Sequence, residues 1–528
     1  MEEFDIVVIG GGSGGSAAAG RLSEDGKFSV CVIEAGGANT SWRVIAPGML
    51  PFLPKPSNWR FETVPQKGLN GRTGYQPRGK GLGGSSAVNA MLYVRGCAWD
   101  YDNWDALGAK GWRYKDVLPV FRRAEGNVRG SDDYHGADGP LSVSDQLWPN
   151  PGSVDFVEAG AELQLPRNPD FNGRQFEGVG LYQVTQRGGE RWTAARAYVV
   201  PQKAAGRLHV ETGALVEKIL IENGRAVGVR IRQGRTTRTI RARRAVILSG
   251  GAFGTPQTLM LSGIGPADHL KAHGIDVVVD RPAVGSDLQD HIDYVASFQT
   301  GGDVFNGTTL SASIRFLKSV FEWRSKRTGT LTTPYAEAGG FAKTRPDVAI
   351  PDVQFHFVPA MLEDHGRTSV SGTGYSIHVC VLRPESRGTV RLASANAQDA
   401  PLIDPNFLAD DRDLEVLRAG VKLVHRINAA PSLAKHKGRD RHDTPLHDDA
   451  ALDQMIRNRS DTVYHPVGTA RMGSDADAVC DPHLRVRGVE GLYIADASVM
   501  PRLVSGNTNA PSVMIGERCA DFVRADLG

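Results

Sequence analysis

Residues 4–15 read FDIVVIGGGSGG, and this stretch decides the fold. The apolar run at 4–9 is typical of a buried parallel strand. The glycines that follow contain the pattern G-x-G-x-x-G at Gly10, Gly12 and Gly15. In that pattern the first glycine allows a tight turn, the second admits a pyrophosphate, and the third lets a helix pack on the strand. The stretch therefore predicts a nucleotide-binding strand, loop and helix.

The residues after the glycine loop complete a βαβ unit. Small residues over 16–22 predict a helix, and the apolar run at 28–33 predicts a second strand. Glu34 ends that strand, about 20 residues beyond the loop, where a carboxylate accepts hydrogen bonds from a ribose. The helix N-terminus would hold the pyrophosphate, because its free N–H groups and its dipole favour an anion. We expect a bound dinucleotide, and this pattern does not separate FAD from NAD.

The rest of the chain predicts a second region of β structure and several helices. Residues 207–250 predict strands with a hairpin turn at 222–224. Further strands are expected at 351–358 and 375–383. Helices are expected at 255–265, 410–428 and 511–525.

Composition excludes several classes of protein. A chain of 528 residues with 41% hydrophobic residues is long enough for two lobes. A net charge of +2 gives no reason to expect a nucleic-acid partner. No apolar run reaches the roughly 18 residues needed to span a bilayer, and no signal peptide is apparent. The five cysteines are widely spaced and predict neither a disulfide framework nor a zinc site. A cytoplasmic location is expected, with peripheral membrane contact left open.

An arginine-rich segment spans residues 230–244. We interpret it as the solvated face of a hairpin. The alternative is a docking site for an anionic membrane or for an electron-accepting partner.

Longer motifs resemble those of the glucose-methanol-choline (GMC) oxidoreductase family. Residues 79–102 resemble the first family signature, and residues 251–265 resemble the second, with Thr258 at a usually aliphatic position. Further family-like motifs lie at 284–291, 383–390, 403–407, 465–473, 495–501 and 505–511. The resemblance therefore runs through most of the chain.

The resemblance implies an α/β fold, α+β overall. A Rossmann-type FAD-binding domain is expected beside a substrate domain whose antiparallel sheet is flanked by helices. The FAD-binding domain would comprise residues 1–155, 205–295 and 455–528. The substrate domain would comprise residues 156–204 and 296–454.

The resemblance also implies FAD as the cofactor. Some family members tether FAD through a histidine in the first signature, and Val88 stands at that position here, so we expect noncovalent FAD. The loop 79–92 should lie along the flavin, with Asn89 near the isoalloxazine ring. Cofactor contacts are expected from Gly10, Gly12, Ser13, Gly14, Gly15, Glu34, Ala35, Trp59, Gly83, Asn89, Ala90, Leu92, Val216, Asp496, Ala497 and Pro511.

Two residues occupy the catalytic positions that the resemblance implies. Oxidising an alcohol removes a proton from oxygen, and a histidine suits that step near neutral pH. His465 stands at the family's base position, and Asn509 stands at the partner position, from which an amide would donate to the substrate oxygen. The alternatives are a buried structural histidine and a helix N-cap. Tyr464, Val463 and His356 are expected to line the substrate pocket, although His356 is equally well explained as a hydrogen-bonded strand residue.

The expected reaction is the FAD-dependent oxidation of a primary alcohol to the aldehyde, with hydride transfer to flavin N5. Electrons would pass to a quinone or another acceptor. One alternative is an oxidase of aryl or furanic alcohols that reduces oxygen to hydrogen peroxide. Another is a flavin-containing lyase or decarboxylase. Choline remains a possible substrate only with a cation-binding carboxylate or an aromatic cage, which the sequence does not identify. No metal site is predicted, and the oligomeric state is not predicted.

Overall fold

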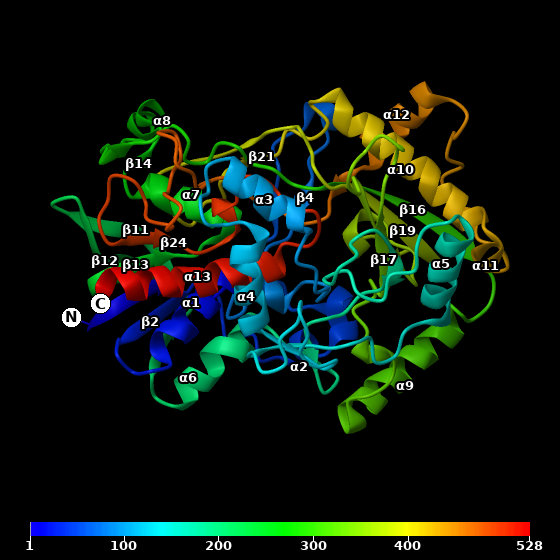
Figure 1. The fold of residues 1–528 in the computed structure, drawn as a ribbon, viewed down its shortest axis with the longest axis horizontal. Helices are drawn as coiled ribbons and strands as arrows, with labels where there is room; N and C mark the ends of the chain where they lie inside the picture. The colour runs from blue at the N-terminus through cyan, green and yellow to red at the C-terminus, as the bar shows by residue number, and fades with distance from the viewer. Residues whose placement is uncertain (1) are drawn as a thin grey trace.

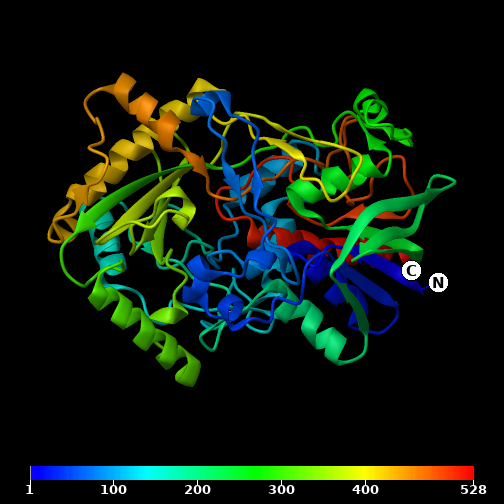
Figure 2. The same cartoon turned by 180° about the vertical axis from the view of Figure 1, so that it is seen from behind.

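The computed structural model describes residues 2–528. Two seven-stranded sheets organise the chain. They lie beside one another along the long axis of the molecule, and both termini lie at the end that carries the first sheet (Figure 1). The view from behind shows the same two lobes (Figure 2).

The first sheet contains the predicted βαβ unit. Its strand order is β10-β2-β1-β13-β12-β11, and β24 pairs with β13. β1, β2, β10, β13 and β24 are parallel, whereas β12 and β11 continue the sheet as an antiparallel hairpin. The strands are β1 (Glu2–Ile9), β2 (Val30–Glu34), β10 (Leu208–Thr212), β11 (Ala214–Glu222), β12 (Arg225–Gln233), β13 (Thr236–Leu248) and β24 (Leu492–Ile494).

Helix α1 (Ser13–Ser23) starts in the glycine loop and packs on the last helix, α13 (Asn509–Leu527). The contact is close because small residues meet there. A Cβ atom added at Gly516 would lie 2.2 Å from the carbonyl oxygen of Gly14. Only glycine permits this approach, so α13 is held against the helix that begins at the nucleotide loop.

The second sheet is antiparallel, with order β22-β16-β19-β18-β17-β7 and β23 paired to β16. Helices α5, α10, α11 and α12 lie beside it, and the core between helices and sheet is apolar. The elements are β7 (Gly178–Leu181), β16 (Ile292–Thr300), β17 (Ala338–Ala342), β18 (Val353–Val358), β19 (Thr373–Val381), β22 (Arg439–Asp440), β23 (Asp461–Thr462), α5 (Pro151–Glu162), α10 (Asp411–Ala429), α11 (Pro431–Ala434) and α12 (Asp449–Arg459).

The other helices and strands lie outside these two sheets. These helices are α2 (Trp42–Ile45), α3 (Ala98–Ala106), α4 (Tyr114–Ala124), α6 (Val200–Ala204), α7 (Gly251–Leu261), α8 (Ala267–Ala272) and α9 (Leu310–Lys326). These strands are β3 (Phe61–Glu62), β4 (Tyr75–Gln76), β5 (Glu125–Asn127), β6 (Leu141–Val143), β8 (Gln186–Arg187), β9 (Glu190–Arg191), β14 (Ile264–Gly265), β15 (Val279–Asp280), β20 (Thr389–Arg391) and β21 (Leu402–Asp404).

Most predicted elements are confirmed, and one helix ends earlier than predicted. The helix expected over 255–265 is α7, which ends at Leu261. Gly263 then adopts a φ of +83°, a left-handed conformation that stops the helix. Ile264 and Gly265 form β14 instead.

The sheets place some segments differently from the predicted domain boundaries. The boundary at 155/156 falls inside α5, which packs on the second sheet. β16 begins at Ile292, and β23 joins the second sheet, although both segments were assigned to the FAD-binding domain. Conversely, the π-helical turn Ala195–Val199 packs on α1 and belongs to the first core. The core that each segment joins is decided by where its apolar residues are buried. The sequence pattern does not show this location.

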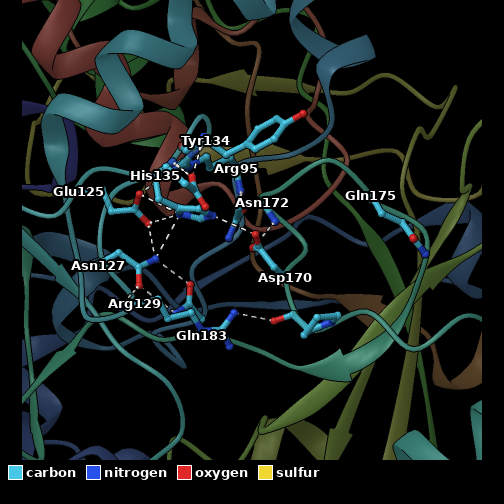
Figure 3. Close-up of polar contacts among 12 residues, drawn as sticks. Arg95, Glu125, Asn127, Arg129, Tyr134, His135, Asp170, Asn172, Gln175 and Gln183 are labelled. Atoms are coloured by element: carbon cyan, nitrogen blue, oxygen red, sulfur yellow. Dashed lines mark hydrogen bonds and ion pairs between the residues drawn. The ribbon is translucent and has the colours of Figure 1, made fainter.

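A buried polar network lies on the chain just beyond the expected flavin loop (Figure 3). The guanidinium of Arg95 donates to Glu125 over 2.5 Å, and both side chains are almost fully buried. Glu125 also accepts from Asn127 at 3.0 Å, and His135 bridges Glu125 to Asp170. A buried charge needs such partners, because an unpaired one is costly in a low-dielectric interior.

The arginine-rich segment is the outer part of the β12–β13 hairpin. Most of its guanidiniums pair with acidic side chains, such as Glu217, Glu211, Glu222 and Asp5. These pairs neutralise the segment and agree with the interpretation as a solvated hairpin face. All five cysteines in the described residues are free thiols.

Candidate functional site

A cavity of about 2460 Å³ lies between the two sheets. Its wall includes the loop between β1 and α1, and it also includes strand residues from β16, β18 and β19. Small-molecule pockets typically measure about 300–1,000 Å³. The cavity therefore has room for a dinucleotide and a second ligand together.

The glycine loop and the end of β2 form one end of this cavity. A Cβ at Gly10 would lie 2.2 Å from the carbonyl oxygen of Ser249, whereas a Cβ at Gly12 would meet no atom within 4 Å. Gly12 thus faces open space at the N-terminus of α1, where backbone N–H groups favour an anion. The Glu34 carboxylate accepts from the backbone N–H of Gly11 at 2.9 Å and of Gly81 at 2.9 Å. These hydrogen bonds fix the position of the glycine loop, and Glu34 lies on the cavity wall.

The structure places most of the predicted cofactor residues on the cavity wall. They are Gly10, Gly12, Ser13, Gly14, Glu34, Ala35, Trp59, Asn89, Ala90, Leu92, Val216, Asp496 and Ala497.

Three predicted cofactor residues do not line the cavity. A Cβ at Gly15 would lie 2.1 Å from the carbonyl oxygen of Gly10, so this glycine serves helix packing. The N–H of Gly83 donates to the carbonyl of Gly11 at 2.7 Å and supports the loop from behind. Pro511 is buried in the first turn of α13. Each of these residues shapes the loop or the helix, and none faces the open space.

The segment expected to follow the flavin does run along the cavity, which Val88 and Asn89 line. A buried arginine that the sequence analysis missed holds this segment. Arg191 donates to the backbone carbonyl of Asn89 at 2.6 Å and to its side-chain oxygen at 2.9 Å. Burial lowers the pKa of Arg191 to about 9. No motif pointed to this residue, because its partners are distant in sequence.

His465 is buried at the cavity wall, in the turn that follows β23. Asp290 anchors that turn, since its carboxylate accepts from the backbone N–H of His465 at 2.8 Å and from the hydroxyl of Thr462 at 2.5 Å. Tyr464 has a φ of +75°, a strained backbone conformation for a non-glycine residue. Such strain occurs most often where a site needs a side chain in one particular direction.

Both ring nitrogens of His465 have partners. Its Nδ1 lies 2.9 Å from Nδ1 of His291, and its Nε2 lies 3.2 Å from the amide nitrogen of Asn507. The Nε2 of His291 lies 3.0 Å from the carbonyl oxygen of Leu382. Two residues without an assigned role, His291 and Asn507, therefore surround the predicted base. Both lie within the motifs at 284–291 and 505–511, in Gln289-Asp-His291 and Asn507-Thr-Asn509.

The prediction for Asn509 differs from the geometry. Asn509 is the first residue of α13, and its side-chain oxygen accepts from the hydroxyl of Ser13 at 2.7 Å. It therefore faces the glycine loop and leaves Asn507 beside His465. The backbone turns sharply before these residues, with Gly506 at a φ of +140°, so two nearby asparagines point to different parts of the cavity.

The second sheet contributes polar side chains to the cavity. His356 and His378 face one another across β18 and β19. His378 lies 2.6 Å from the Asp293 carboxylate. In the described residues His356 has no hydrogen-bond partner on either nitrogen, and Asp293 has none on Oδ1. His356, Asp293, Tyr464 and Val463 all line the cavity. A buried polar atom without a partner needs an explanation, such as a water molecule or a ligand that binds beside it.

A redox enzyme that holds its cofactor on a βαβ unit needs a cavity shared with its substrate. The open space at Gly12, the N-terminus of α1 and Glu34 fit the pyrophosphate and the ribose of a dinucleotide. Elsewhere on the cavity wall, the ring of His465 lies beside the side-chain amide of Asn507. This fold and cavity define the class: a dinucleotide-dependent oxidoreductase.

Comparisons with known proteins narrow the class. Family models described as GMC oxidoreductase match residues 4–293 and 384–516. The chain is 45% identical to the alcohol dehydrogenase [acceptor] of Pseudomonas putida, over 98% of this chain and 95% of that enzyme. It is 43% identical to the mitochondrial choline dehydrogenase of Homo sapiens, over 99% of this chain and 90% of that enzyme.

Solved structures show the same fold. Pyridoxine 4-oxidase from Mesorbium loti superimposes with a TM-score of 0.87 and 30% identity, over 98% of each chain. Formate oxidase superimposes with a TM-score of 0.92 and 26% identity, over 99% of this chain and 98% of that chain.

The chain belongs to the GMC oxidoreductase family. It is therefore an FAD-dependent oxidoreductase. In the described residues no helix is long and apolar enough to cross a membrane.

Proposed function

We propose that this protein oxidises a primary alcohol to the aldehyde, with His465 as the acceptor of the hydroxyl proton. FAD, when bound, supplies the flavin N5 that accepts the hydride. The electrons then pass to a quinone or another acceptor. The observation that carries the proposal is the hydrogen-bond chain that ends at His465 Nε2.

That chain assigns the proton on each histidine. The carbonyl of Leu382 only accepts, so His291 must donate to it from Nε2. The Nδ1 of a neutral His291 is then an acceptor, and His465 donates to it from its own Nδ1. The Nε2 of His465 is left without a proton, at the cavity wall. A histidine with this tautomer is ready to take a proton.

The pKa values keep both histidines neutral. Burial lowers the pKa of His291 to about 3. Burial, with the nearby His291 and His356, lowers the pKa of His465 well below its ordinary value of 6.5. At neutral pH His465 is therefore unprotonated on Nε2 and able to act as a base.

Asn507 completes the pair. Its amide nitrogen lies 3.2 Å from His465 Nε2, so an alcohol oxygen placed beside both groups would donate to the histidine and accept from the amide. As the proton leaves, the amide stabilises the negative charge that develops on oxygen. We therefore assign to Asn507 the partner role that the sequence analysis gave to Asn509. Asn509 would instead help to position the loop at Ser13.

FAD is held noncovalently in this proposal. Val88 lines the cavity where some family members carry a tethering histidine, and its side chain has no nucleophilic atom.

Asp293 favours a second class of substrate. Its carboxylate lies in the cavity wall, with Oδ1 unpartnered in the described residues and Oδ2 near His378. A carboxylate in this position would attract a cationic alcohol such as choline. In this alternative Asp293 would be the cation-binding carboxylate that choline requires.

Anaerobic mixing of the yellow holoenzyme with aliphatic, benzylic, furanic and choline-type alcohols tests the function. Bleaching of the flavin band by one class would support alcohol oxidation and identify the substrate type. On admission of air, slow recolouring that a quinone accelerates indicates a dehydrogenase, and rapid recolouring with peroxide indicates an oxidase. An enzyme that no alcohol bleaches would contradict the proposal and favour lyase or decarboxylase chemistry.

Asn507→Ala is expected to slow flavin reduction by about 10²-fold, because an amide that stabilises a developing oxyanion contributes on this scale. Asn509→Ala is the matched control, two residues away, and should change the reduction rate far less. Anaerobic stopped-flow spectroscopy of both holoenzymes measures the difference. Equal losses in the two variants, or a larger loss for Asn509→Ala, would contradict the assignment of Asn507.

A further inference from the structure

Helix α9 carries an apolar stripe on its outer face. Four large apolar side chains are exposed, at 79% for Leu310, 46% for Ile314, 58% for Leu317 and 74% for Phe321. At about 100° per residue, these positions fall within roughly 60° of one another around the helix. Ala312 and Trp323, the buried residues of α9, lie on the opposite side. The stripe therefore points away from the protein core.

Two basic residues flank this stripe, whereas Arg315 and Arg327 pair with Asp303 and Glu190. From Leu310 to Arg327 the sequence has five basic residues and one acid, Glu322. Lys318 and Arg324 lie on the two sides of the stripe, and within residues 2–528 neither forms an ion pair with an acid. An apolar centre with cationic edges is what a helix in a membrane interface presents. Its apolar side chains enter the acyl boundary, while long basic side chains reach the phosphates.

The stripe adjoins the opening of the cavity. Leu317 lines the cavity and is also exposed, and the same holds for Phe52, Trp148 and Val304. The ring of Phe52 lies 5.3 Å from the ring of Phe316 on α9. This contact packs α9 against the turn Pro47–Phe52. Figure 1 labels α9 at the lower edge of the molecule and α12 at the opposite edge, and Figure 2 shows the same green helix at the lower edge from behind.

We propose that α9 docks this protein on an anionic lipid bilayer, with the opening of the cavity turned toward the lipid. In this proposal α9 lies in the plane of the membrane interface, with its apolar stripe toward the acyl chains. This inference goes beyond the proposed reaction and does not depend on it. An apolar substrate or an apolar electron acceptor would then reach the cavity directly from the membrane.

A second copy of this chain fits the surface less well. In a symmetric dimer the same patch occurs on both sides of the interface, so α9 would meet α9. The basic residues of one copy would then lie against those of the other, and this repulsion opposes the pairing. Anionic headgroups neutralise the same charges, and the bilayer takes up the apolar stripe.

Flotation of the holoenzyme with lipid vesicles tests the proposal. One vesicle preparation contains phosphatidylcholine alone, and the other contains phosphatidylcholine with phosphatidylglycerol. We expect the protein to float with the anionic vesicles and to be released from them as salt is raised. The double variant Ile314→Ser/Phe321→Ser should bind these vesicles at least about tenfold more weakly. The matched control is Val278→Ser/Leu402→Ser, whose wild-type residues are 48% and 47% exposed elsewhere on the surface; it should bind as the wild type does.

Flavin absorbance confirms that each variant is folded and loaded. Wild-type holoenzyme that stays in solution with anionic vesicles would overturn the proposal. So would equal binding by the α9 variant and the control. Light scattering tests whether a second copy of the chain occupies this surface instead. A wild-type dimer that Ile314→Ser/Phe321→Ser dissociates, without vesicle binding, would show that α9 contacts a second copy.

Discussion

His465→Ala is expected to lower the rate of flavin reduction by an alcohol about 10³-fold, with FAD still bound. General-base catalysis contributes about 10²–10⁴-fold to such reactions. The hydrogen-bond chain from Leu382 through His291 leaves His465 Nε2 unprotonated, and alanine removes this nitrogen. Anaerobic stopped-flow reduction, with the ratio of flavin to protein measured on the same sample, checks both parts of the expectation.

The matched control is His483→Ala, which removes an exposed histidine that stacks on Phe522 and does not line the cavity. It should leave the reduction rate unchanged. Full turnover by His465→Ala would rule out the mechanism. Loss of flavin together with turnover would instead indicate that His465 supports the structure of the site.

Glu125→Ala is expected to cost about 3–5 kcal/mol of stability, because it leaves a buried guanidinium without its carboxylate. Arg95 and Glu125 are 1% and 0% exposed, and Glu125 also accepts from Asn127 and His135. Water cannot replace these partners without opening the core. Urea unfolding of the holoenzyme, followed by tryptophan fluorescence and by flavin release, measures the loss.

An exposed pair provides the comparison. Arg167 and Glu158 are also 2.5 Å apart, but their side chains are 61% and 43% exposed. Glu158→Ala should therefore cost far less stability than Glu125→Ala, because solvent screens such pairs and replaces the lost contact. Similar losses for Glu125→Ala and Glu158→Ala would show that burial gives the inner pair no special role. A small loss in both would exclude the network as a main source of stability.

Much of the fold could be predicted from local sequence. The nucleotide-binding unit is predicted by the run 4–9, the glycine loop and Glu34. Each of these signals depends only on residues that are close to it in the sequence. The structure confirms that unit and places Glu34 on the cavity wall. Local pattern was less informative about domain boundaries, since α5 and β23 join the second sheet through long-range packing alone.

The sequence by itself determined the βαβ unit and the class of cofactor, because these depend on residue type and short spacing, whereas the proposal of His465 as the base rests on the family resemblance. Only the tertiary structure decided that Asn507 rather than Asn509 lies beside His465, since backbone direction over a sharp turn sets where an amide points. It also decided that His291 lies beside His465, and that the apolar residues of α9 face outward. Those arrangements arise where distant segments meet, and no local pattern records which segments will meet.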